Sequence, residues 1–185
     1  MPNSSRNIKI DSDCVTNFKK MAEDLHLRAA QWAGLFVQYE LDFLKRDFLY
    51  FSKNTDLAYK YLTQKYKKES NLESYSIRMN QELIDDLMIW CKGYKIDKAM
   101  FIEYALKSAY ERVGVTTDSA EERNIKRHDL MPLYLLEHSF TERLSLKKRR
   151  NVFRERLLIK DDLIPDDFKR EMNVKVDGRR KSTTK

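Results

Sequence analysis

The feature that most constrains this chain is an internal repeat. Residues 6–44 align with residues 75–113 at a constant offset of 69 residues and without a gap. Only two aligned positions carry identical residues, but apolar residues coincide at 17 of them. A shared apolar layout at a fixed offset indicates two structural units of the same kind that pack against each other.

Each copy begins with a stretch in which polar and apolar residues alternate, Asn7–Ile10 in the first and Ser76–Met79 in the second. A period of two predicts a strand with one apolar and one polar face. Asp11 and Asn80 then stand where an N-cap would begin a helix, and a short turn leads to a second helix. The predicted apolar helix faces contain Cys14, Phe18, Met21, Ala22, Ala33, Phe36, Val37, Leu41 and Leu44 in copy one, and Leu83, Leu87, Trp90, Cys91, Ile102, Ala105, Leu106, Tyr110 and Val113 in copy two.

A unit of one strand and two helices in about 40 residues cannot bury its own apolar surface, so each unit needs a partner. With this layout the sequence resembles the ribbon-helix-helix family of DNA-binding proteins, the group that contains the Arc and MetJ repressors. The resemblance covers roughly 80 of the 185 residues. It implies an antiparallel ribbon that enters the major groove of double-stranded DNA, above a core of four helices. Some accessory proteins of conjugative plasmid relaxosomes also look like this, with tandem copies in one chain.

The predicted fold class is therefore mainly α, a tandem ribbon-helix-helix with a basic helical extension. Two features depart from the family pattern. The turn His26–Arg28 has neither a Gly nor a Ser, Thr or Asp cap. Asp97 stands at the cap of the second helix of copy two, where family members often carry Ser or Thr, and a carboxylate beside a phosphate is repulsive. The alternative interpretation is two ordinary amphipathic helical hairpins, because apolar residues at helical spacing usually form only a core.

Base reading is expected on the polar side of the two strands. If Ile8, Ile10, Ile77 and Met79 face the helices, strand alternation turns their neighbours to the opposite side. The predicted base-reading residues are Ser5, Asn7, Lys9, Ser74, Ser76 and Arg78. Arg and Lys donate to guanine, Asn pairs with adenine, and Ser adapts to several base edges. Because the two sets differ, a ribbon within one chain favours an asymmetric site over a perfect palindrome. The alternative is that the two cations are merely solvated strand charges.

The remaining sequence divides into a connector and a C-terminal region. We predict four segments: copy one in 1–44, a helical connector in 45–73, copy two in 74–114, and a basic helical region with a disordered tail in 115–185. In the connector, tyrosines at 59, 61 and 66 alternate with lysines, a pattern that favours a solvated basic helix face over phosphate contacts. Beyond Val113 the sequence predicts a polar turn and then a helix interrupted near Pro132.

A basic helix is predicted after the capping-box pair Ser139 and Glu142. Leu146, Phe153 and Leu157 form its narrow apolar stripe, and residues 141–160 hold eight Lys or Arg residues against two acidic ones. The predicted phosphate contacts are Arg28, Lys98, Lys147, Lys148, Arg149, Arg150 and Arg154. The alternative is that the stripe packs on the body and the charges stay in water. The acidic stretch 161–167 is expected to face this helix or the basic tail at 176–185.

Composition limits the classes of fold, location and partner that this chain can have. With 4 Gly and 3 Pro in 185 residues, an all-β sandwich or a Gly-rich nucleotide fold is disfavoured. No apolar run approaches the ~18 residues that span a bilayer, and the first residues lack a secretory apolar core. The two cysteines lie within apolar patterns, which suggests a reduced, cytoplasmic protein. Because no run is long enough to span a bilayer, no membrane partner is expected. A net charge of +7 favours a polyanionic partner.

No catalytic or metal motif is present. His26, His128 and His138 are scattered, and the sequence has no CxxC, HExxH, P-loop or GxSxG pattern. We therefore expect neither an enzyme nor a cofactor. The favoured hypothesis is a sequence-specific DNA-binding protein, either a repressor or an accessory factor of a larger nucleoprotein complex, with self-association left open. The alternative is an interaction protein such as an antitoxin or scaffold, which grips a protein partner through its C-terminal region.

Overall fold

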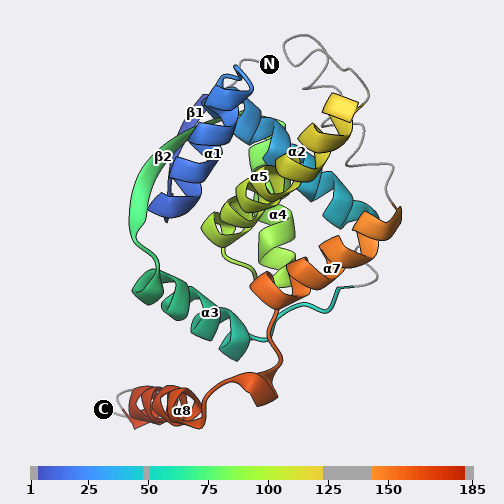
Figure 1. Ribbon diagram of the computed structural model, residues 1–185. Helices are drawn as coiled ribbons and strands as arrows, with labels where there is room; N and C mark the ends of the chain where they lie inside the picture. Colours follow the sequence, from blue (N-terminus) through green and yellow to red (C-terminus); the bar gives the residue numbers. More distant parts are fainter. Residues whose placement is uncertain (1–3, 48–50, 123–142, 182–185) are drawn as a thin grey trace.

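A two-stranded antiparallel sheet lies along one edge of a mainly helical body in the computed structural model of the chain (Figure 1). The structure describes residues 4–47, 51–122 and 143–181, with side chains for 5–47, 51–111 and 150–173. In chain order, the described elements are β1 (Ser4–Asp11), α1 (Ser12–Asp24), α2 (Ala29–Arg46), α3 (Asp56–Glu69), β2 (Leu72–Met79), α4 (Gln81–Tyr94), α5 (Lys98–Glu122), α7 (Arg143–Leu157), the 3-10 helix η2 (Asp161–Leu163) and α8 (Asp166–Lys181). The predicted helical class and the antiparallel ribbon are confirmed.

Both strands are longer than the alternating stretches that predict them. Ser4 pairs with Met79 and Asp11 pairs with Leu72, so the ladder runs over all eight residues of each strand. Beyond its end, the amide of Ser12 donates to the Asn71 carbonyl at 2.8 Å. Pairing across the ribbon supplies backbone partners that a single strand lacks, and this extends β2 two residues before the predicted start of copy two.

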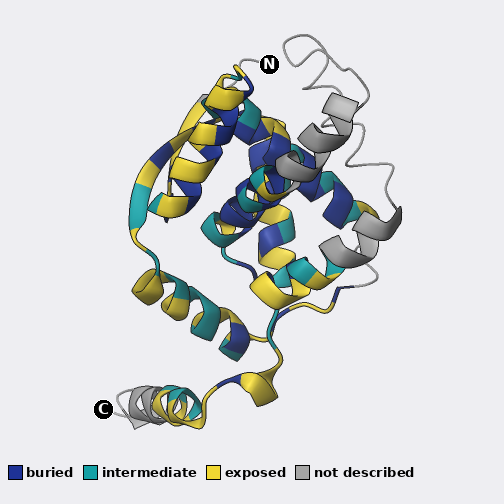
Figure 2. Ribbon diagram, viewed as in Figure 1, coloured by how far each residue is buried: buried dark blue, intermediate teal, exposed yellow. Residues whose placement is uncertain are grey.

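The core lies between the inner face of the ribbon and the helices. Ile10 and Ile77 are fully buried, and Phe18 of α1 meets Phe36 of α2 edge to face, with ring centroids 6.1 Å apart. Figure 2 shows the buried residues gathered in α2 and α5, whereas α3 and the described part of α8 are largely exposed. The predicted inward residues Ile8 and Met79 also belong to this core, which confirms the strand alternation.

The turns that follow α1 and α4 have the same backbone geometry. His26 and Lys95, which the 69-residue offset aligns, both adopt a left-handed conformation, with φ of 54° and 53°. In the next residues, the Leu27 amide donates to the Ala22 carbonyl at 2.7 Å, and the aligned Ile96 amide donates to the Cys91 carbonyl at 2.9 Å. These are the 6→1 bonds of a Schellman motif. Neither turn has a Gly at the left-handed position. The absence of a Gly at this position of the turn His26–Arg28 is therefore shared by both copies and does not set copy one apart from copy two.

The predicted helix starts are found in the structure, with different caps. The Asn80 side chain accepts from the Leu83 amide at 2.8 Å, whereas Asp11 makes no side-chain cap for α1 and instead accepts from the Asn71 amide at 3.2 Å. The connector helix α3 begins at a Thr55 cap and buries only Ala58 of its residues, so its lysines face solvent as predicted. We expected a polar turn beyond Val113, but α5 continues to Glu122, because no Pro interrupts this stretch.

The C-terminal region docks through α7. Phe153 and Leu157 of the predicted stripe are buried, and the Phe153 ring packs against Phe51 and Tyr104 at centroid distances of 4.5 and 5.5 Å. Leu146, Ser139, Glu142, Pro132 and the two later histidines lie outside the residues whose side chains are described. In the acidic stretch, Asp161 accepts from the Thr55 hydroxyl at 2.5 Å. The side chains of the basic tail, one of the two partners expected for this stretch, lie outside the described residues.

Residues 176–181, which the sequence assigns to a disordered tail, form the end of α8 in the structure. Pro165 precedes this helix, and Asp166 and Asp167 lie in its first turn, where negative charge complements the helix dipole. The single Gly178 costs a helix about 1 kcal/mol, which is too little to end it. Residues 182–185 lie outside the described part of the chain.

Candidate nucleic-acid interface

The outer face of the ribbon carries all six residues predicted to read bases. The alternation of the strands buries Ile10 and Ile77 and leaves this opposite face exposed. The register brings the six residues together as three directly opposed pairs, which are Ser5–Arg78, Asn7–Ser76 and Lys9–Ser74. Their role in DNA binding stays a prediction.

The cations of this face are available for a ligand. Within the described part of the chain, neither Lys9 nor Arg78 makes an ion pair. Ser5 and Ser76 share a hydrogen bond between their hydroxyl groups across the ribbon. Exposed guanidinium, ammonium, amide and hydroxyl groups in one row offer both donors and acceptors to the edges of base pairs.

A hollow of about 390 Å³ lies beside one end of the ribbon, lined by Arg28, Ala29, Ala30, Gln31 and Arg78. Arg28 immediately precedes α2 and its side chain makes no cap hydrogen bond. The hollow therefore joins one predicted phosphate contact, Arg28, to one predicted base reader, Arg78. Two guanidinium groups at one opening favour an anionic ligand.

Gly34 sets how closely α2 approaches the ribbon. A β-carbon at this position would lie 2.0 Å from the carbonyl oxygen of Arg78, so any larger residue would push the helix and the strand apart. The sequence patterns predict no role for Gly34. The available signal was a Gly in the interior of a helical pattern, which often marks a close approach.

Asp97, which the repeat aligns with Arg28, caps the start of α5. Its carboxylate accepts from the amides of Ala99 at 2.8 Å and Met100 at 3.4 Å, as the sequence predicts for a helix cap. The neighbouring Lys98 is exposed. The two helix starts beside the ribbon thus differ in charge, with a guanidinium group at α2 and a capping carboxylate at α5.

The basic helix α7 lies on the far side of the helical body from the ribbon (Figure 1). Arg150, predicted to bind phosphate, makes a two-pronged contact with Asp47, with nitrogen–oxygen distances of 2.8 and 3.1 Å. Arg154 is exposed, while the side chains of Lys147, Lys148 and Arg149 lie outside the described residues. The phosphate contacts predicted on this helix stay predictions, and the helix lies apart from the base-reading face of the ribbon (Figure 1).

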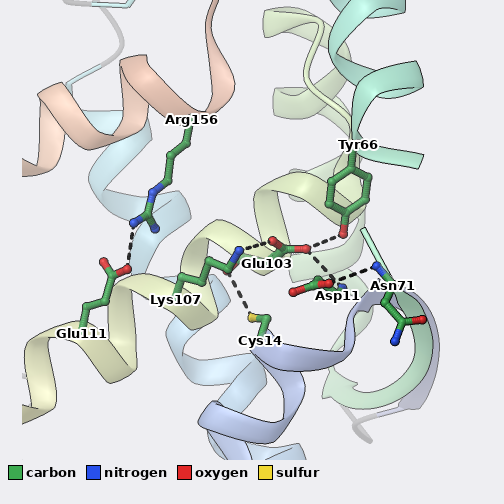
Figure 3. A network of polar contacts seen from close by, with 8 residues as sticks. All are labelled: Asp11, Cys14, Tyr66, Asn71, Glu103, Lys107, Glu111 and Arg156. Atoms are coloured by element: carbon green, nitrogen blue, oxygen red, sulfur yellow. Dashed lines mark hydrogen bonds and ion pairs between the residues drawn. The ribbon is translucent and has the colours of Figure 1, made fainter. Parts of the chain in front are cut away.

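A second polar cluster surrounds Glu103 of α5, the residue that the repeat aligns with Gly34. Its carboxylate accepts from the Tyr66 hydroxyl at 2.5 Å and the Asp11 amide at 3.2 Å, and it pairs with Lys107 at 2.6 Å (Figure 3). The residue is 7% exposed. This cluster therefore ties the connector helix α3 and the end of β1 to α5.

The groups around Glu103 have shifted pKa values. Burial, together with the hydrogen bond to Glu103, raises the pKa of Tyr66 above its usual range. Burial raises the pKa of the Cys14 thiol to about 12. Burial disfavours the charged form of Lys107, but the hydrogen bond and ion pair with Glu103 outweigh it and raise its pKa. These shifts favour protonated Tyr66 and Cys14 and a charged Lys107 at neutral pH.

A cavity of about 360 Å³ opens beside the cluster and is lined in part by Tyr66, Glu103, Lys107 and Arg156. Both cations are paired at its wall, Lys107 with Glu103 and Arg156 with Glu111 at 2.7 Å. Internal pairing of this kind holds elements together and leaves little net charge for a ligand. Glu103 and Lys107 lie at i,i+4 spacing on α5, which is a signal that the sequence offers. Sequence patterns could not find the rest of the cluster, because Tyr66 and Asp11 come from other elements.

Among the described residues, no group of three or more His, Cys, Asp and Glu side chains lies where it could hold a metal ion. No helix in the described ranges is both long enough and apolar enough to cross a membrane.

The chain was also compared with protein families, with characterised proteins and with solved structures. No family model, no curated protein and no solved structure matches it.

Proposed function

We propose that this chain is a tandem ribbon-helix-helix protein that binds double-stranded DNA in a sequence-specific manner. In this proposal the ribbon enters the major groove, and the protein acts as a repressor or as an accessory factor of a larger nucleoprotein complex. The helical class and the ribbon are observed, whereas the tandem arrangement and the DNA are inferred.

The register of the ribbon carries the proposal. Asn7 and Ser76, which the 69-residue offset aligns, are direct partners in the ladder. Two equivalent strands that cross at a twofold axis must pair equivalent residues at that axis, and an arbitrary pairing of two strands would not do so. The matching left-handed residues His26 and Lys95 support the same equivalence at the helix turns.

The exposed face of the ribbon supports DNA as the partner. A two-stranded ribbon fits the major groove, and the side chains that it turns outward are of the types that recognise base edges. The unpaired Lys9 and Arg78 lie at opposite ends of this face, and Arg28 adds a further cation beside Arg78. Contacts of such cations with phosphates would supply a salt-dependent part of the affinity.

Selection of bound duplexes from random DNA tests the proposal, followed by affinity measurements on the selected site. The double variant Lys9→Ala/Arg78→Ala should lose most discrimination between the selected site and random DNA, because each good base contact contributes about 1–3 kcal/mol. The matched control is Lys53→Ala/Lys160→Ala, which removes the same charge from exposed positions. These lie before α3 and before η2, on segments away from the strands (Figure 1).

The control variant should keep its discrimination and lose at most a small part of its overall affinity. If wild-type protein enriches no sequence, or if both double variants behave alike, the ribbon is not a sequence reader. Helical content by circular dichroism confirms that each variant is folded.

One observation favours the second candidate, an interaction protein. Met88 and Ile89 of α4 are 56% and 66% exposed, whereas the aligned positions in α1 carry Lys19 and Lys20. An apolar pair that the fold does not need is typical of a contact surface. This candidate predicts co-purification with a protein partner and no loss of function on substitution of Lys9 and Arg78.

A further inference from the structure

The ribbon has a centre and two ends that are not equivalent. Asn7 and Ser76 mark the centre, and the aligned cations Lys9 and Arg78 lie at opposite ends, paired with Ser74 and Ser5. Only these two aligned positions differ on the outer face, because the third aligned pair is Ser5 and Ser74. The asymmetry of the face is therefore confined to Asn against Ser at the centre and Lys against Arg at the ends.

The two end cations differ in what they can bind. Arg presents a planar fork that contacts the two acceptors of guanine together, while Lys is a flexible point charge with no fixed geometry. The Arg78 end should therefore specify its base pair more strictly than the Lys9 end. At the centre, an amide faces a hydroxyl, so the two DNA strands meet different groups there.

The surroundings of the two ends differ in the same direction. Arg28 lines one hollow together with Arg78. At the position aligned with Arg28, Asp97 places a carboxylate that is occupied in capping α5. A phosphate near the Arg78 end would meet two guanidinium groups, whereas a phosphate near the aligned place in the other half would meet a negative charge. Contacts with the bases and contacts with the phosphates should therefore both contribute more affinity in the half of the site that meets Arg78.

We propose that the protein recognises a non-palindromic duplex site in one orientation, with a strict half read by Arg78 and a permissive half read by Lys9. The inference rests on the proposed function and specifies its substrate. Along β1, Ser5 opposite Arg78 and Lys9 are four residues apart, which is about 13 Å at the rise of a strand. At about 3.4 Å per base step, the two cations lie about four steps apart on one core site.

The chain offers a direct test because two substitutions make the outer face symmetric. Asn7→Ser/Lys9→Arg gives both strands the series Ser, Ser, Arg, and the reciprocal Ser76→Asn/Arg78→Lys gives both strands Ser, Asn, Lys. All four positions are exposed, so the folds should persist. Each protein is used as the full chain in selection from random DNA. Each is then measured on three duplexes: the wild-type site, the palindrome of its strict half and the palindrome of its permissive half.

Wild-type protein should prefer the composite site, whereas Asn7→Ser/Lys9→Arg should prefer the palindrome of the strict half. The reciprocal variant should bind its preferred duplex more weakly than wild type binds the composite site. On the composite site, Arg78→Ala should lower affinity roughly 5- to 150-fold, and Lys9→Ala should lower it less.

The outcomes separate this inference from the proposed function. Enrichment of a perfect palindrome by wild-type protein, or the same preferred duplex for wild type and both symmetric variants, would overturn the directional site and leave sequence-specific binding intact. If no protein enriches any sequence, the proposed function itself fails.

Discussion

At the scale of single residues, the most constrained position is Gly34. The helix α2 can approach β2 only because this residue has no side chain, and the atom in the way of a β-carbon is a backbone oxygen that cannot rotate aside. The aligned residue Glu103 does the opposite, since it fills the corresponding space with a carboxylate that binds the Asp11 amide. At two aligned positions, the helix thus packs on the strand in different ways: without a side chain at Gly34, and through a hydrogen-bonded carboxylate at Glu103.

Gly34→Ala should destabilise the protein by about 1–3 kcal/mol, because overpacking forces the helix and the strand apart. Gly93→Ala is the matched control: no atom lies within 4 Å of its β-carbon position, and the residue lies inside α4. Ala there should be neutral or stabilise by up to about 1 kcal/mol. Chemical denaturation of both variants checks the prediction, which equal effects of the two substitutions would contradict.

Burial of Tyr66, together with its hydrogen bond to Glu103, should make stability fall at alkaline pH. The pKa of Tyr66 is raised in the folded protein, so the folded state holds this proton more tightly than the unfolded state. The stabilisation is complete below a pH of about 10, the usual pKa of tyrosine, and is lost as the pH rises towards the folded pKa. Tyr66→Phe should be less stable than wild type at pH 8, and the difference should shrink above pH 10. Denaturation at both pH values measures it.

At the scale of elements, one buried polar side chain, Asn54, joins the C-terminal segment to the rest of the molecule. Asn54 is 3% exposed, and its amide nitrogen donates to the carbonyls of Lys95 at 3.0 Å and Leu157 at 2.8 Å. Its amide oxygen accepts from the Ile159 amide at 3.1 Å. Asn54 therefore joins the connector, the turn after α4 and the end of α7. The pair of Arg150 with Asp47 fixes the same helix against the end of α2.

Asn54→Ala should destabilise the protein by about 2–4 kcal/mol, because it leaves buried backbone groups without partners. Amide hydrogen exchange should rise first in residues 150–159, which lose their anchor. Asn151→Ala, at an exposed position of α7, provides the control and should change neither quantity. Uniform loss of protection across the ribbon and α7 would show that the segment does not open separately.

At the scale of the whole molecule, both strands of the ribbon belong to one chain, and so do the helices that cover its inner face. The paired units therefore complete their core without a second subunit. The chain also has two distinct sides, with the ribbon on one and α7 on the other (Figure 1). A ligand bound to the ribbon would therefore lie on the opposite side of the molecule from α7.

The protein should be a monomer in solution without DNA. Light scattering over a range of concentrations should give a mass near 22.2 kDa, the mass of one chain. A stable mass of twice this value, lost on substitution of strand residues, would instead indicate that strands are exchanged between chains. Exposed Met88 and Ile89 provide the control, since their replacement by Lys should not alter a strand-exchanged dimer.

The sequence by itself determined the two strands, the helices that follow them and the face on which each residue lies. These features depend on the period of apolar residues and on caps such as Asn80, which act between near neighbours. For the same reason, six residues of the candidate interface could be assigned to one face, although the extra strand length and the longer α5 could not.

Only the tertiary structure decided which distant residues meet. The close approach of Gly34 to Arg78, the hydrogen bond of Tyr66 to Glu103 and the pairing of Arg150 with Asp47 join residues more than 35 positions apart. Such contacts depend on how helices and strands pack in three dimensions, and no local pattern encodes them. The pairing of Arg150 with Asp47 and the position of α7 opposite the ribbon follow from this packing alone.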